Sequence, residues 1–207
     1  MNDQVIAATT FLSVYLFLAL SHRFRALAVW VGVVLLLLLR TLSPLEALRT
    51  VNWNVLGIFW GTLVVAELFV YSKLPARLAN WLVGRSRNVG MAILLVSGLA
   101  GFISSFCENV ATVLIIAPIA LEIARNLKTS PTPFLIGIAV SSNLEGAATL
   151  IGDPPSMILA GFTNMTFNDF FFFKGKVGIF FAVQVGAILS SVVLYMLFRK
   201  LSQPVIK

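Results

Sequence analysis

The sequence predicts an all-α integral membrane protein that forms a single transmembrane domain over residues 1–207. Of these 207 residues, 59% are hydrophobic and 11% are charged, whereas a soluble domain carries about twice that charged share. Because one crossing needs roughly 20 apolar residues, the length fits about five transmembrane helices. Two polar interruptions inside apolar stretches add a re-entrant helical hairpin and one broken helix to this prediction.

Charge and motif content exclude other classes of protein. The net charge is +7, but the basic residues sit singly or in pairs at the ends of apolar segments, which is typical of membrane topology. We therefore expect a lipid bilayer as partner and no nucleic acid. No signal peptide is expected, because no basic run precedes a small-residue cleavage site. Metalloprotease and serine-hydrolase motifs are absent from the sequence, so we expect no enzyme.

The first half of the chain predicts peripheral helices followed by a span. Within residues 1–50, segments 5–20 and 26–39 are apolar, and Ser43-Pro44-Leu45-Glu46 is a helix-start signature. Residues 51–88 contain a full span at 51–71. A segment at 74–84 follows, in which basic residues surround apolar ones, and this pattern indicates an interfacial helix.

Residues 89–128 predict the re-entrant hairpin. Segments 91–107 and 110–124 are apolar, and only Glu108 and Asn109 separate them. At 1.5 Å per residue, each helix would be roughly 23–26 Å long, which is short of the ~30 Å hydrocarbon core. Two full spans need a turn that reaches water, so a hairpin whose tip lies inside the protein fits better. Two short, tilted spans are the alternative.

Residues 132–162 predict the broken helix, and residues 176–200 the last span. A helix begins near residue 133, and Gly146, Gly152, Pro154 and Pro155 interrupt it. We expect Asp153 and Pro154 to be extended, and a second half-helix to run over 155–162. The segment 163–176 is expected to be a loop whose phenylalanines lie at the membrane interface.

The distribution of positive charge predicts the orientation. Placing the hairpin base and the C-terminus on one side puts 11 of the 15 basic residues there. By the positive-inside rule this side is cytoplasmic, so the N-terminus is expected outside. The expected location is the inner or plasma membrane of the cell.

Polar residues at the hairpin tip are candidates for an ion or substrate site. The helix before the tip ends in free carbonyls, which attract cations, and the next helix begins with free amides, which attract anions. Ser105, Glu108, Asn109 and Thr112 add side-chain oxygens there. The structural alternative is that Glu108 or Asn109 only caps the second helix.

The second break repeats this arrangement. Asn143, Glu145 and Thr149 are expected where the helix unwinds, and Gly146 allows close backbone approach or a positive φ. Asp153 either joins the site or caps the next half-helix. Glu145 suits proton or sodium coupling, because neither break contains a lysine or arginine.

These residues predict a coupling ion, Na⁺ or H⁺, and no resident cofactor. A possible sodium site combines the side-chain oxygens of Asn109, Thr112 and Asn143.

From about residue 47 to 173 the chain resembles the ion-transporter superfamily, in particular its group of arsenical pumps, sodium–proton antiporters and citrate transporters. Three segments carry the resemblance: 51–56, 108–114 and the run Ala148-Thr149-Leu150-Ile151-Gly152-Asp153-Pro154-Pro155. The resemblance implies a hairpin and a broken helix in each of two inverted repeats, which hold ions and substrate. The chain departs from the family pattern at Asn52, Glu108, Glu145 and Ser156, and Glu145 puts substrate identity in doubt.

The resemblance covers only the first, N-terminal repeat. It implies a half-size subunit of a secondary active transporter for a small anion or oxyanion, such as a dicarboxylate, citrate or arsenite, or for Na⁺/H⁺ exchange. The expected partner is a second transmembrane polypeptide resembling the C-terminal repeat, or a second copy of the chain. A membrane subunit that keeps the fold without transporting is the alternative function, and an intramembrane enzyme is a third.

Overall fold

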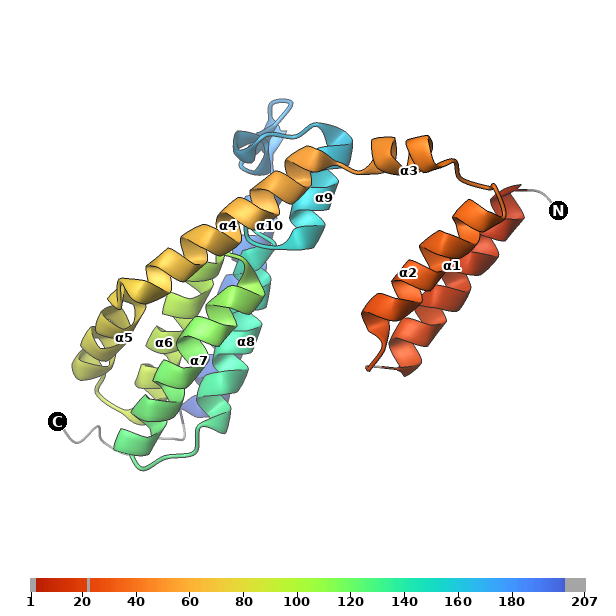
Figure 1. Ribbon diagram of the computed structural model, residues 1–207. Coiled ribbons are helices and arrows are strands. Elements are labelled where there is room, and N and C mark those ends of the chain that lie inside the picture. Colours follow the sequence, from red (N-terminus) through yellow and green to blue (C-terminus); the bar gives the residue numbers. More distant parts are fainter. Residues whose placement is uncertain (1–2, 22, 200–207) are drawn as a thin grey trace. The chain divides into compact units, whose positions relative to one another are not determined.

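The computed structural model describes residues 3–21 and 23–199, and α-helices dominate this part of the chain (Figure 1). The protein is an all-α membrane protein, as predicted. Lys200, which closes the expected last span, lies outside the described residues. In chain order the helices are α1 Asp3–Leu20, α2 Arg25–Leu38, α3 Pro44–Thr50, α4 Trp53–Tyr71, α5 Leu74–Arg85, α6 Val89–Ser104, α7 Asn109–Asn126, α8 Thr132–Gly146, α9 Pro154–Thr163 and α10 Ile179–Phe198.

The chain divides into two compact units, residues 1–52 and 53–207, and the single transmembrane domain stays a prediction. In the first unit α1 packs against α2, and Gly32 lies close to Val14. The predicted helix start is present as a capping box: the Glu46 N–H donates to Ser43 Oγ (3.2 Å), and the Ser43 N–H donates to Glu46 Oε2 (3.0 Å).

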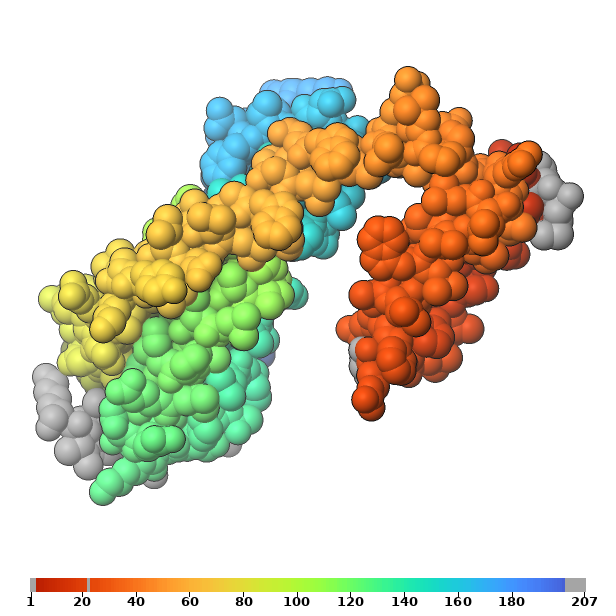
Figure 2. Space-filling view, viewed as in Figure 1, coloured from red at the N-terminus to blue at the C-terminus, as the bar shows by residue number. Residues whose placement is uncertain are grey.

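Helix α6 forms the core of the second unit. Eleven of its 16 residues are buried, among them Ala92, Ile93 and Val96, which have no exposed surface. Helix α8 packs against it most extensively, and α5, α7 and α10 also contact it. In Figure 2, α4 and α7 lie on the viewed face of this unit. Because α6 is apolar all round, it is suited to the centre of a helix bundle.

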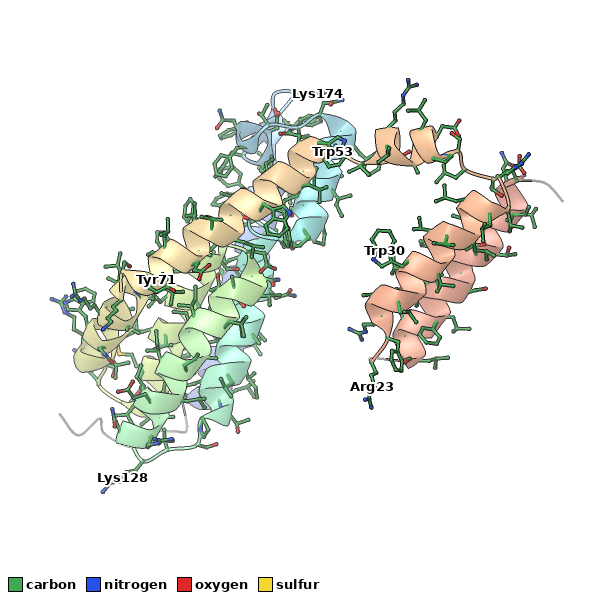
Figure 3. All side chains as sticks on the ribbon, viewed as in Figure 1. Arg23, Trp30, Trp53, Tyr71, Lys128 and Lys174 are labelled. Carbon is green, nitrogen blue, oxygen red and sulfur yellow. The ribbon has the colours of Figure 1, made fainter. Side chains whose placement is uncertain are left out.

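Four described helices are long and apolar enough to cross a membrane: α1, α4, α7 and α10. Helix α7 has 18 residues and is longer than the predicted segment 110–124, whereas α6 has 16 residues and is short, as predicted. Figure 3 shows Lys128, in the turn after α7, and Lys174 at opposite ends of the second unit. The re-entrant hairpin, its alternative of two tilted spans, and the orientation of the chain stay predictions.

The break after α8 lies later than predicted. Helix α8 continues through Glu145 to Gly146, so the unwound segment is 147–153. Asp153 is extended as predicted (φ −150°, ψ 156°), but Pro154 is the first residue of α9. A proline is well tolerated there because its missing N–H would have no partner within the helix.

The segment 163–176 is more ordered than the predicted loop. It contains a 3₁₀ helix, η1 Phe167–Phe170, and the first strand of a short antiparallel hairpin, β1 Phe172–Phe173, which pairs with β2 Lys176–Val177. Phe170 is fully buried against Leu150 and Ala160. The prediction of interfacial phenylalanines is therefore wrong for Phe170, because its ring packs inside a small apolar cluster of the protein.

The start of α6 depends on a close approach to the end of α10. A Cβ atom added to Gly90 would lie 2.6 Å from the carbonyl oxygen of Phe198, whereas a Cβ at Gly98 in the same helix meets open space. We expect Gly90→Ala to destabilise the protein by about 1–3 kcal/mol through overpacking against backbone. Gly98→Ala should be neutral or stabilising by up to about 1 kcal/mol. Thermal unfolding of the two purified variants checks this, and equal stabilities would contradict it.

The start of η1 is a capping box outside the expected spans. The backbone N–H and the hydroxyl of Thr166 both donate to Asp169 Oδ2 (2.7 Å each), and these hydrogen bonds lower the pKa of Asp169 below its usual range. The stabilisation is present above the ordinary carboxyl pKa and is lost as the pH falls through the lowered value. We expect Thr166→Ala to raise the pKa of Asp169 in an NMR titration. An unchanged pKa would show that the hydrogen bond from the Thr166 hydroxyl does not stabilise the carboxylate.

Candidate functional site

The structure brings the two interruptions together. The hydroxyl of Ser104, the last residue of α6, donates to the carbonyl of Ser142 in α8 (2.8 Å). Thr149 Oγ1 donates to the carbonyl of Ser105 (2.6 Å), and the backbone N–H of Asn109 donates to the carbonyl of Gly152 (3.0 Å). Backbone groups near the linker between α6 and α7 therefore form hydrogen bonds with the unwound segment 147–153, and the reverse also holds. Irregular chain inside an apolar protein requires such partners.

Glycines allow this close approach, but in another way than predicted. Neither Gly146 nor Gly152 has a positive φ. A Cβ on Gly152 would overlap the carbonyl of Gly146, so the two ends of the unwound segment touch. The close approach that these two glycines allow is thus one between two parts of the chain. Thr149 is buried and its hydroxyl is engaged with the linker, which gives it a structural role.

Two predicted site carboxylates cap helices. Glu108 Oε2 accepts a hydrogen bond from the N–H of Ala111 (2.9 Å) at the start of α7, and Asp153 Oδ1 accepts one from the N–H of Ser156 (2.9 Å) at the start of α9. Both residues are buried. Glu108 and Asp153 are therefore both helix caps, whereas Asn109 is the first helical residue and not the cap. A role of Glu108 or Asp153 in binding is compatible with capping and stays a prediction.

These caps change the electrostatics of the site. A helix N-terminus carries a partial positive charge that favours an anion. Here a carboxylate of the protein already lies at each of the two N-termini, and residues 88–124 and 132–173 contain no lysine or arginine. The arrangement is thus better suited to a cation than to a free anion.

Asn109 and Asn143 meet across α7 and α8. Asn109 Nδ2 donates to Asn143 Oδ1 (3.1 Å), although Asn143 lies within α8 and not in the unwound segment. The amide pair borders an open groove of about 730 Å³ between the two helices, which Val113 and Val140 also line. The structure therefore unites two of the three residues of the predicted sodium site.

Thr112, the third residue, lies one turn after Asn109. Its side chain is fully buried, and Oγ1 has no hydrogen-bond partner among the residues that the structure describes. A buried hydroxyl without a partner costs about 1–3 kcal/mol, so this oxygen is free to receive an ion or a water molecule.

Glu145 does not join the amide pair. Its Oε2 accepts a short hydrogen bond from Gln184 Nε2 in α10 (2.6 Å) and a long one from Ser105 Oγ (3.4 Å). Glu145 is also part of α8 and half-buried, so the prediction that it sits in an unwound segment is wrong.

Gln184 is a site residue that the sequence analysis missed. It is the one residue with a side-chain amide or charge in the 20-residue helix α10. A polar residue inside a transmembrane segment is a functional candidate by default, and this rule applied to α10 would have found it.

Comparisons with known proteins identify the family of the chain. A family model described as "Citrate transporter" matches residues 15–206. Among curated proteins, a "46 kDa membrane protein" of Mycobacterium leprae is 30% identical over 191 residues, covering 90% of this chain and 44% of that protein. The magnetosome protein MamN of Paramagnetospirillum magneticum is 32% identical over 170 residues, covering 80% of this chain and 38% of that protein.

A further relative is an uncharacterised transporter of Mycobacterium tuberculosis, which is 35% identical over 121 residues, 58% of this chain and 28% of that protein. The chain spans less than half the length of these curated relatives. Because the family model covers most of the chain, the resemblance to citrate transporters is confirmed, and the chain belongs to the citrate transporter family.

Proposed function

We propose that the chain is a half-size subunit of a secondary active transporter that uses a sodium or proton gradient. The substrate is a small anion or oxyanion, such as a dicarboxylate, citrate or arsenite, or the reaction is Na⁺/H⁺ exchange. One observation carries the proposal: two irregular segments pair inside an apolar helix bundle. Beside them lie polar side chains that have no structural role, namely the Asn109–Asn143 pair and Thr112. Discontinuous helices of this kind hold ions and substrates in secondary transporters.

In this proposal the cation site uses the side-chain oxygens of Asn109, Thr112 and Asn143. Amide and hydroxyl oxygens are hard ligands of the kind that Na⁺ prefers. The buried, unpartnered Oγ1 of Thr112 supports this role most directly, since a bound ion would satisfy it. The capping carboxylates of Glu108 and Asp153 add negative charge near the junction.

The substrate anion then needs positive charge from elsewhere. The paired segments supply none, so the anion is balanced by the coupling cation or by groups on another polypeptide. This reasoning favours a transport cycle in which the cation is bound before the anion, because each negative charge placed inside the membrane is costly without a counter-charge.

A second transmembrane unit is part of the proposal. The groove beside the amide pair is open, and Asn143, Val110 and Leu114 on its rim are exposed, the last two to 58% and 69%. We propose that a polypeptide resembling the C-terminal repeat covers this groove, or else a second copy of the chain. The complex lies in the inner or plasma membrane, with the N-terminus outside and the C-terminus in the cytoplasm.

One observation favours the alternative of a non-transporting structural or regulatory subunit. Several predicted site residues, namely Glu108, Thr149 and Asp153, have structural hydrogen bonds. The two functions assign different roles to Asn143, whose side chain bonds Asn109 and neither caps a helix nor bonds the backbone. In a transporter this side chain is an ion ligand, whereas in a structural subunit it is not.

The role of Asn143 can be tested by transport in proteoliposomes that contain the native complex, with sodium and pH gradients varied independently. We expect Asn143→Ala to weaken the apparent sodium affinity by about ten- to a hundredfold, because loss of one ligand to a charged ion costs about 1.5–3 kcal/mol. Asn80→Ala, on the exposed side of α5, is the matched control and should change nothing. Normal sodium dependence in both variants would remove the amide pair from the mechanism, and absence of any coupled flux would favour the structural subunit.

The second unit can be tested by purification from native membranes. We expect this chain to co-purify in a fixed ratio with a transmembrane polypeptide that resembles the C-terminal repeat. Cross-linking from a cysteine placed at Leu114 should capture the same polypeptide, because that residue lies on the rim of the groove. Recovery of the chain alone, as an active dimer, would reject a separate partner.

A further inference from the structure

Helix α5 has one buried face and one exposed face. Its buried residues include Ala79 and Val83, and the helix packs against α4, α6 and α7. On the other side, Arg77, Trp81 and Arg85 are exposed. Residues that are four positions apart share one face of a helix. Two guanidinium groups therefore lie one turn before and one turn after a single indole ring, on the outside of the unit.

Trp81 lies directly beside the Arg85 guanidinium. The guanidinium carbon is 4.1 Å from the centroid of the Trp81 ring, which is within the range of a cation–π interaction. The indole is itself 53% exposed. A guanidinium over an aromatic face keeps its N–H groups at the edge of its plane, where they can donate two parallel hydrogen bonds to a phosphate.

The positive charge of this face is not balanced by nearby carboxylates. Lys73, before the first residue of α5, and Arg87, shortly after its last, are also exposed. Residues 68–107 contain no aspartate or glutamate. The carboxylates on the helices packed against α5 are Glu67 in α4 and Glu122 in α7. Within the described part of the chain, neither forms an ion pair with a basic residue of α5 or its two ends. The face is therefore suited to a negatively charged partner.

Further cations lie at the same end of the second unit. Residues 86–88 connect α5 to the start of α6, and the linker 105–108 connects α6 to α7, so the end of α7 lies beside the start of α6 (Figure 1). Arg125 and Lys128, at the end of α7, are exposed, and Figure 3 shows Lys128 at this end. This is the end that the charge distribution predicts to be cytoplasmic. Anionic lipids of that leaflet attract basic segments beside a span.

The apolar residues of the exposed face favour a lipid over an acidic protein segment. Leu74 lies on the same face as Trp81, seven positions earlier, and is 44% exposed. A helix that combines exposed leucine and tryptophan with arginines meets headgroups and the start of the acyl chains together. The positive-inside rule accounts for basic residues at this end, but it requires neither their alignment on one face nor the contact between Arg85 and Trp81.

We propose that the exposed face of α5 binds the headgroup of an anionic phospholipid. The face is formed by Leu74, Arg77, Trp81 and Arg85. The Arg85 guanidinium, held against Trp81, donates to the lipid phosphate, and Arg77 adds a positive charge about 12 Å away along the helix. Leu74 and the indole contact the upper part of the acyl chains. The inference goes beyond the transport proposal and does not depend on it, because it needs only a bilayer around the protein.

The lipid site is tested by the fluorescence of Trp81 in the purified full-length chain, reconstituted in vesicles. Trp30, Trp53 and Trp60 are replaced by phenylalanine, which keeps an aromatic ring at three positions that are at least 66% exposed. Brominated phosphatidylglycerol, which is anionic, and brominated phosphatidylcholine, which has no net charge, then quench Trp81 according to their occupancy of the face. We expect phosphatidylglycerol to be preferred about tenfold or more. Equal quenching by the two lipids would overturn the proposal.

The arginines are tested in the same background. One basic residue near an anionic surface raises affinity about fivefold, so Arg77→Gln and Arg85→Gln should each lower the preference for phosphatidylglycerol by about that factor. Arg125→Gln is the matched control, because it removes the same charge from an exposed position at the end of α7 and should change the preference less than about twofold. Equal losses in the three variants would mean a diffuse effect of charge and would reject a site on α5.

The geometry at Trp81 is tested by Arg85→Lys, which keeps the charge and removes the planar guanidinium. We expect a preference between those of Arg85→Gln and the unchanged protein, because an ammonium group cannot donate two parallel hydrogen bonds to the phosphate. A preference equal to that of the unchanged protein would reject the role of the stacked guanidinium.

Two further outcomes identify a different occupant of the face. If inorganic phosphate at constant ionic strength restores the fluorescence of Trp81, the face takes a free anion and the lipid is rejected. If neither brominated lipid quenches Trp81, protein covers the face, and the lipid is rejected as well. Coupled flux of the reconstituted native complex is a separate measurement, so failure of the lipid site and failure of the transport proposal are distinguishable.

Discussion

The structure of the second unit depends on one constraint: backbone that leaves a helix inside an apolar protein must find its hydrogen bonds within the protein. Here the two irregular segments supply them to each other. Thr149 bonds the linker through Ser105, and Gly152 receives the N–H of Asn109. Glu108 and Asp153 complete the start of the two following helices. The junction is thus held together by hydrogen bonds between the two segments.

Helix α8 forms side-chain hydrogen bonds with two neighbouring helices. Its contact with α6 is the most extensive in the unit, so its position is fixed. From that fixed helix, Asn143 reaches α7 and Glu145 reaches α10.

The sequence was a good guide wherever one strong local signal acts. Apolar length located the helices, and the Ser43 signature, the polar tip at Glu108 and the prolines after Asp153 located three helix starts. The sequence was a poor guide to contacts between residues that lie far apart in the chain. Glu145 remains helical, and its carboxylate accepts a hydrogen bond from Gln184, which lies 39 residues away in the sequence. Gly152 packs closely against the backbone of Gly146, and Phe170 packs in a small apolar cluster. Neither contact can be predicted from the residues next to it in the sequence.

The central claim is that the junction of the two breaks holds a cation. The most direct test is equilibrium binding of radioactive sodium to the purified native complex, in competition with potassium. The protein is compared with Thr112→Val, which keeps the shape of the side chain and removes the buried Oγ1. The account predicts saturable, sodium-selective binding that is weakened about tenfold or more in the variant. Equal binding by the two proteins, or no saturable binding at all, would contradict it.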